Sequence, residues 1–161
     1  MGSTQRLAAF NEAVRRLLDV VARLPEGGLG KKLETATPRD LLARLIVWNR
    51  RIQDGCRTLS QGKTPAYFSD AVEGYAEVQT EAARQFGQLD RRGLTEELTA
   101  SKEQLVAYLS DLESTEWNRD RGFRHPEGGP ATVLRELEGL TRRYLDAADE
   151  ISLWLDSTST T

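Results

Sequence analysis

The residues best suited to acid–base chemistry are few and gather in one segment. His125 is the only histidine of the chain. Its imidazole could act as a general base, because the ordinary pKa of histidine lies near neutrality. It lies within residues 113–129, a stretch rich in charged and aromatic residues. The competing interpretation is a solvated loop histidine, or one that packs on a neighbouring residue.

Acids of the same stretch are candidates for activating a water molecule. Glu113, Glu116 and Asp120 lie there, and general-base catalysis needs a carboxylate within hydrogen-bonding reach of the water. Loop acids are usually only solvated, yet long segments without regular structure are often functional. The sequence therefore predicts Asp120, Glu116 and His125 as catalytic candidates.

Aromatic and cationic side chains could form a binding pocket. Trp48 and Trp117 could form its wall, or pack in the core. Tyr144 lies on an apolar stripe, so its hydroxyl would position a substrate or close an internal hydrogen bond. Arg44 lies one turn before Trp48 at the edge of an apolar face. A cation in this position must be paired, lie at a rim, or point into a polar cavity.

The chain is organised around residues 36–52. A helix start is indicated by Thr37, Pro38 and Asp40. The Thr37 side chain can cap the free backbone N–H groups of the first turn, Pro38 fits the first helical position, and the Asp40 side chain can reach back to the Thr37 N–H group. Apolar residues then recur at helical spacing: Leu41, Leu42, Leu45, Ile46, Trp48 and Ile52. We expect a helix that runs to about Leu59.

Four further helices are predicted from apolar periodicity: 4–24, 69–86, 92–113 and 130–156. In the weaker one, 69–86, Ser69 would be the cap, and Val72, Tyr75, Val78, Ala82 and Phe86 would share one side. No useful length alternates with a period of two. We therefore predict an all-α fold: a four-helix bundle with an inserted helix and a long loop before the last helix, not simply up-down-up-down. Residues 1–156 would form one domain and 157–161 a disordered tail.

Composition narrows the class of partner. With 161 residues, a net charge of −3 and a pI near 5.3, the chain lacks the basic field that direct nucleic-acid binding needs. The single Cys56 excludes an internal disulfide and, with one histidine, a Cys/His zinc site. Charged residues interrupt the apolar N-terminal stretch, so we do not expect it to be a signal peptide, and no apolar run is long enough for a membrane span. We expect a cytoplasmic protein, and the oligomeric state, a homodimer included, stays open.

Two stretches carry a family resemblance: Thr-Pro-Arg-Asp-Leu-Leu-Ala-Arg-Leu-Ile-Val-Trp from Thr37, and Arg-Arg-Tyr-Leu-Asp-Ala-Ala-Asp-Glu-Ile-Ser-Leu-Trp-Leu from Arg142. With the order of elements, they resemble the DinB-like four-helix bundles over about residues 5–155. The ClbS/DfsB group is the most similar branch. Many DinB-like proteins bind a divalent metal through three histidines, and the matching positions here are Arg44, Arg143 and Ala147. None of these three residues is a histidine, so the resemblance implies neither a bound metal nor another cofactor.

The namesake of that branch opens the cyclopropane of a DNA-alkylating genotoxin by hydrolysis. By resemblance, we expect a metal-independent protein that binds, and could hydrolyse, an electrophilic small molecule as a resistance protein. The alternative is a non-catalytic bundle that sequesters a ligand or binds a partner. In the first interpretation the pocket walls would be Trp48 and Trp117, and Tyr144 would position the substrate. Negative charge would be stabilised by Arg44 and Arg143. Asp120 or Glu116 would activate the water, and His125 would transfer a proton.

Overall fold

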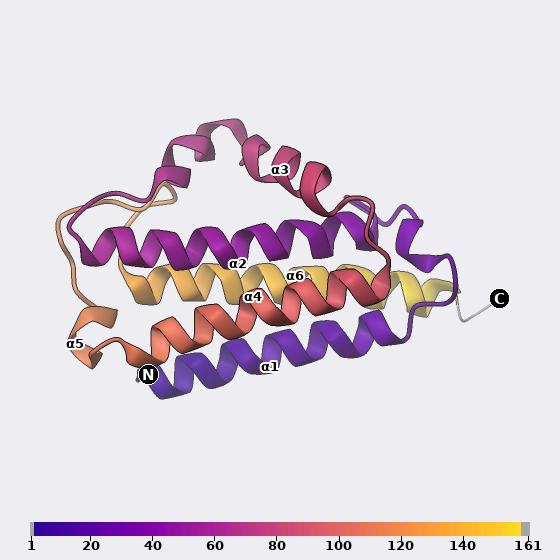
Figure 1. Ribbon diagram of the computed structural model, residues 1–161, viewed down its shortest axis with the longest axis horizontal. Helices are drawn as coiled ribbons and strands as arrows, with labels where there is room; N and C mark the ends of the chain where they lie inside the picture. The colour runs from indigo at the N-terminus through magenta and orange to yellow at the C-terminus, as the bar shows by residue number, and fades with distance from the viewer. Residues whose placement is uncertain (1, 159–161) are drawn as a thin grey trace.

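The computed structural model describes residues 2–158, and within this range it consists of helices and the loops that join them (Figure 1). The all-α bundle with an inserted helix and a long loop before the last helix is thereby confirmed. The elements are α1 (Ser3–Ala22), η1 (Gly28–Gly30), α2 (Pro38–Ser60), η2 (Ala66–Glu73), α3 (Ala76–Phe86), α4 (Arg91–Asp111), α5 (Ser114–Trp117) and α6 (Val133–Thr158).

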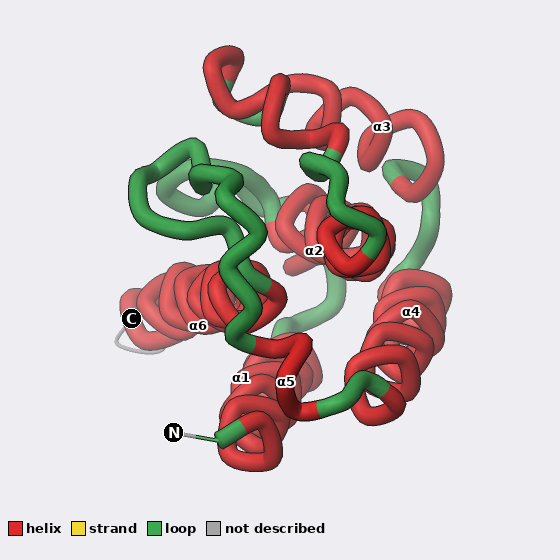
Figure 2. The backbone as a smooth tube through the Cα atoms, turned by 90° about the vertical axis from the view of Figure 1, so that its left-hand side faces the viewer, coloured by secondary structure: helices red, strands yellow, loops and turns green. Residues whose placement is uncertain are grey.

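The four long helices α1, α2, α4 and α6 form the bundle, with η2 and α3 lying outside α2 (Figures 1 and 2). Helices α1 and α6 run in one direction, and α2 and α4 run in the other. This up-down-down-up order needs one long crossover, through η2 and α3, because α2 and α4 run in the same direction. The connection over residues 112–132 is also long, although it joins two helices of opposite direction at the same end of the bundle. These connections come together beside the N-terminal half of α6, where the candidate site lies.

Helix α2 begins at the predicted cap. The Thr37 hydroxyl accepts a hydrogen bond from the Asp40 amide at 3.1 Å, and the Asp40 carboxylate accepts one from the Thr37 amide at 3.3 Å. This reciprocal pair satisfies two of the donors that a helix N-terminus leaves free. The helix then packs against α3, α4 and α6, so its position fixes that of the other three.

A buried polar chain joins three helices of the bundle. Tyr144 of α6 is fully buried, and its hydroxyl donates a hydrogen bond to the Asn49 side-chain oxygen at 2.9 Å. The Asn49 amide in turn donates to the Ser101 hydroxyl at 3.0 Å. Burial raises the pKa of the Tyr144 hydroxyl, which therefore remains a proton donor. The tyrosine closes an internal hydrogen bond, one of its two predicted roles.

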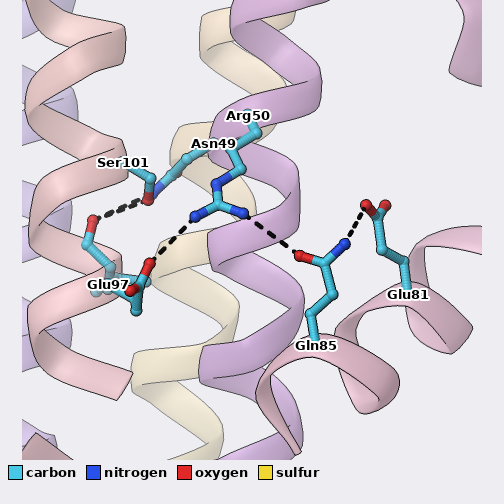
Figure 3. A network of polar contacts seen from close by, with 7 residues as sticks. Asn49, Arg50, Glu81, Gln85, Glu97 and Ser101 are labelled. Atoms are coloured by element: carbon cyan, nitrogen blue, oxygen red, sulfur yellow. Dashed lines mark hydrogen bonds and ion pairs between the residues drawn. The ribbon is translucent and has the colours of Figure 1, made fainter. Parts of the chain in front are cut away.

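Surface ion pairs fasten α3 to the bundle (Figure 3). Arg50 of α2 reaches Glu97 of α4 at 3.1 Å and the Gln85 side-chain oxygen of α3 at 3.4 Å. Gln85 also donates to Glu81, and Glu81 pairs with Arg51 at 2.7 Å. Partly exposed pairs of this kind each contribute little free energy, but together they fix the orientation of α3.

The helix predicted over 69–86 is wrong in its first half. Gly74 and Tyr75 both adopt left-handed conformations, with φ of 64° and 61°, so they break the segment into η2 and α3. Val72 is consequently 90 % exposed rather than part of the apolar face. The residue at the N-cap of α3 is Tyr75 and not Ser69, and the buried Asp70 carboxylate accepts a hydrogen bond from the first-turn amide of Glu77 at 3.2 Å.

At the C-terminus, α6 continues through Thr158, so Ser157 and Thr158 of the predicted tail are helical. Residues 159–161 lie outside the described range. No helix formed by residues 2–158 is both long enough and apolar enough to cross a membrane.

Candidate functional site

A cavity of about 230 Å³ lies between α2, α6, the η2–α3 segment and the loop before α6. Helix α2 supplies Trp48 and Ile52, and the loop supplies His125 and Glu127. The other lining residues are Tyr67, Tyr75, Glu136, Gly139, Leu140, Arg142, Arg143 and Asp146. The cavity thus places a histidine, carboxylates, phenols and guanidinium groups around one small space.

Glu136 is the most unusual of these residues. It lies in the first turn of α6 and is only 2 % exposed. Its Oε1 atom makes no hydrogen bond within the described structure. A buried carboxylate oxygen without a partner is costly, although the nearby N-terminus of α6 favours a negative charge. Such an oxygen is free to accept a proton or a hydrogen bond from a ligand.

His125 contacts the other oxygen of this carboxylate. Its Nε2 atom lies 3.5 Å from Glu136 Oε2, and its Nδ1 atom accepts a hydrogen bond from the Glu127 amide at 3.0 Å. In the neutral ring, Nδ1 is therefore the acceptor and the proton is on Nε2, directed at Glu136. The loop is held by hydrogen bonds between His125 and the backbone of Gly128 and Gly129.

Tyr67 is the second group with an unsatisfied polar atom. Its ring is buried, and its hydroxyl meets no partner with full hydrogen-bond geometry within residues 2–158. Burial raises the pKa of this phenol most, and the nearby Glu136 carboxylate raises it further through its negative charge and as an acceptor for the hydroxyl, so the phenol holds its proton at neutral pH. Gly55 makes room for the ring, because a Cβ atom there would lie 2.8 Å from Tyr67 Cε1.

An aromatic and cationic wall closes the other side. The rings of Trp48 and Tyr75 meet edge to face at 4.9 Å, and the Arg143 guanidinium lies 3.9 Å from the Trp48 ring centroid. Burial lowers the pKa of Arg143. Tyr75 holds a left-handed conformation that is strained for a non-glycine residue. Strain of this kind often accompanies a functional site.

Of the residues predicted for the site, His125, Trp48 and Arg143 line this cavity. Arg44 lines a neighbouring hollow of about 290 Å³ that shares Trp48 and Arg143 with it. This hollow lies between the second and last helices, and a cavity is one of the environments expected for Arg44. Arg44 is not paired with the loop acids Asp120 and Glu116, because these acids have other partners.

Glu116 and Asp120 do not line the cavity. Glu116 pairs with Arg121 at 3.2 Å and with Arg119 at 2.7 Å, and the hydrogen bond from Arg121 is the main reason that its pKa is lowered. Asp120 accepts a hydrogen bond from the Gly122 amide at 2.9 Å, which closes a local turn. Both acids are thus engaged in ordering the loop.

Trp117 and Tyr144 also lie away from the cavity lining. Trp117, in α5, is 2 % exposed and belongs to the hydrophobic core. Tyr144 contacts Phe10 edge to face at 5.4 Å in that same core. Core packing, the alternative left open for Trp117, is what the structure shows.

Glu136 and Tyr67 were not identified from the sequence. Glu136 is an acid that faces the interior, since it is buried on α6. A signal was present: Glu136 follows Val133 by three residues and precedes Leu140 by four, so it lies on the apolar stripe. Tyr67 offered no comparable signal, because it lies in the irregular segment between α2 and α3.

The positions matched to the metal-binding histidines of DinB-like proteins do meet in space. Arg44, Arg143 and Ala147 line the hollow beside Trp48. Guanidinium and methyl groups are not metal ligands of the kind that zinc or nickel requires. Within residues 2–158, no group of three or more His, Cys, Asp or Glu side chains could hold a metal ion. The residues present do not fit the three-histidine metal centre.

Comparison by sequence gives no family model and no curated protein that matches this chain. Comparison by structure gives several solved proteins of the same fold. DfsB, described as a sibling lethal factor precursor, has a TM-score of 0.79 at 12 % identity over 98 % of this chain and 97 % of its own. The colibactin self-resistance protein ClbS, solved with a double-stranded DNA, has a TM-score of 0.76 at 14 % identity over 96 % of each chain.

The mycothiol-dependent maleylpyruvate isomerase is also similar, with a TM-score of 0.75 at 15 % identity. The match covers 94 % of this chain and 61 % of the isomerase. These matches confirm the fold relationship to DinB-like proteins and to ClbS and DfsB that the sequence resemblance predicted. Identities this low establish the fold alone.

Proposed function

We propose that this protein binds an electrophilic small molecule in the cavity between α2 and α6 and hydrolyses it without a metal ion. The observation that carries this proposal is the buried Glu136 carboxylate, which has one oxygen beside His125 and the other without a partner. Its function would be to detoxify a reactive compound, as a resistance protein does. The compound class that we favour contains a strained three-membered ring, such as a cyclopropane.

In this proposal Glu136 is the general base. His125 donates its Nε2 proton toward Oε2 and thereby orients the carboxylate, while Oε1 accepts a proton from a water molecule in the cavity. General-base catalysis of this kind contributes about 10²–10⁴-fold to a rate. Glu136 thus takes the role that the sequence suggested for Asp120 or Glu116.

Tyr67 is the general acid in this proposal. As the water oxygen bonds to a ring carbon, the strained bond breaks and its electron pair passes to the carbonyl or heteroatom that activates the ring. That atom receives the Tyr67 proton, and the proton held by Glu136 restores the phenol. The net change is the addition of one water molecule. The phenol of Tyr67 is protonated before each turnover, and its raised pKa favours the return of the proton from Glu136 afterwards.

The alternative is a protein that sequesters its ligand without chemistry. The lack of metal ligands at Arg44, Arg143 and Ala147 favours this possibility, since a bundle that has lost one site could retain binding alone. In that case each protein molecule would remove a fixed number of ligand molecules by binding them, and no ligand would be converted to product.

The proposed partner is therefore a small molecule. The absence of direct nucleic-acid binding, a cytoplasmic location and a possible homodimer stay predictions. ClbS itself was solved with DNA, so a DNA-binding assay should accompany any test for a resistance function.

Hydrolysis of styrene oxide and of an acyl-activated cyclopropane, followed by chromatography, tests the proposal. Glu136→Gln and Tyr67→Phe should each lower the rate by about 10²-fold or more. Glu138→Gln is the matched control, since Glu138 lies on the same helix and pairs with Arg6 on the surface. Equal rates for all four proteins, or no hydrolysis above buffer, would reject the proposed chemistry.

A further inference from the structure

The hollow beside Arg44 adjoins the proposed catalytic cavity. Trp48, Arg143 and Asp146 line both spaces, so one small molecule could extend past the indole from one into the other. The hollow measures about 290 Å³, enough for a substituent of several atoms. Its remaining lining residues are Thr35, Leu41, Arg44, Leu45, Ala147 and Glu150.

Both guanidinium groups at this hollow have donors without acceptors. Arg44 makes no hydrogen bond and no ion pair with any residue between 2 and 158. Arg143 stacks on Trp48 and lies 5.1 Å from the Tyr75 ring centroid, but stacking leaves the N–H groups in the guanidinium plane unused. A guanidinium presents five donors in a planar fork, which matches a carboxylate or phosphate.

The acids at the hollow do not occupy these donors. Both oxygens of Glu150 accept hydrogen bonds from Thr35: Oε2 from its amide at 2.9 Å, and Oε1 from its hydroxyl at 2.7 Å. Asp146 is exposed at the rim, where water screens its charge. The interior of the hollow therefore presents guanidinium donors, while one carboxylate is engaged and the other is solvated.

We infer that this hollow is a subsite for an anionic group, such as a carboxylate, carried by the small molecule that the catalytic cavity acts on. This inference rests on the proposed function for the identity of the occupant. It adds a substrate class: an electrophile with a negatively charged substituent that lies in the hollow beside Trp48. Arg44 holds that substituent from the hollow, and Arg143, which lines both spaces, contacts it from the boundary between them.

The test uses three probes with one ring and different charge: benzoate, benzamide and benzylamine. Ligand-observed NMR titration at low salt measures their dissociation constants. Benzoate should bind about tenfold more tightly than benzamide, the gain expected from one charge-assisted contact, and benzylamine should bind most weakly. Arg44→Gln should bring benzoate to within about twofold of benzamide, and Arg44→Lys should fall between the two.

Arg92→Gln is the matched control, because Arg92 is an exposed arginine of α4 that pairs with Glu96. It should keep the preference for benzoate. Equal binding of benzoate and benzamide, tighter binding of benzylamine, or an unchanged preference in Arg44→Gln would each overturn the anionic subsite. Because styrene oxide carries no charge, its hydrolysis tests the proposed function separately. Either idea can therefore fail while the other stands.

Discussion

Replacing Glu136 by glutamine should make the protein more stable while it loses activity. The unpartnered Oε1 of this buried carboxylate costs about 1–3 kcal/mol. A neutral amide of the same shape removes the charge and adds a donor beside the unpartnered Tyr67 hydroxyl. The substitution also weakens the attraction between His125 Nε2 and Oε2, but their separation of 3.5 Å is long for a hydrogen bond. We therefore expect the free energy of unfolding to rise by about 1 kcal/mol.

Urea and thermal unfolding at neutral pH measure this change. A gain of about 1 kcal/mol corresponds to about 2–4 °C in Tm for a chain of this size. Glu138→Gln, the surface control, should alter the free energy of unfolding by less than about 0.5 kcal/mol. A decrease of about 3–5 kcal/mol in Glu136→Gln would refute the reasoning, because that is the cost of breaking a buried ion pair. Glu136 and a protonated His125 would then be a structural pair.

Three further predictions concern the core. Tyr144→Phe leaves the buried Asn49 oxygen without its donor and should lower the free energy of unfolding by about 1–3 kcal/mol in urea melts. Trp48→Ala removes a buried indole that also supports Arg143, so the same assay should show a decrease of about 3–5 kcal/mol. Burial raises the pKa of the Cys56 thiol, so labelling by a thiol reagent should require unfolding. Rapid labelling of the native protein would show that this part of α2 opens.

Helix α2 shows how much of the fold could be predicted from the sequence. Its start depends on Thr37, Pro38 and Asp40, three residues close in sequence whose side chains act locally. Its apolar face follows from helical spacing, and Trp48 is buried as that spacing predicted. The same local information failed over 69–86, because the left-handed turn at Gly74 and Tyr75 depends on contacts with α2 and α6. The Tyr75 ring, for example, packs on Trp48.

The candidate site was harder to predict than the fold. His125, Trp48 and Arg143 could be identified by residue type and spacing, and the structure brings them to one cavity. Glu136 could have been identified from its place on an apolar stripe. Tyr67 depends on a close approach to Gly55, a contact between segments that periodicity does not reveal.

Counting product molecules per protein chain in ¹⁸O-labelled water tests the central claim most directly. The reaction is followed with an acyl-activated cyclopropane, and the products and the protein are analysed by mass spectrometry. A hydrolase that uses Glu136 as the base should release many product molecules per chain, each with one ¹⁸O atom, and leave the protein unmodified. At most one product molecule per chain, or an adduct on the protein, would contradict the account and identify a sequestering or sacrificial protein.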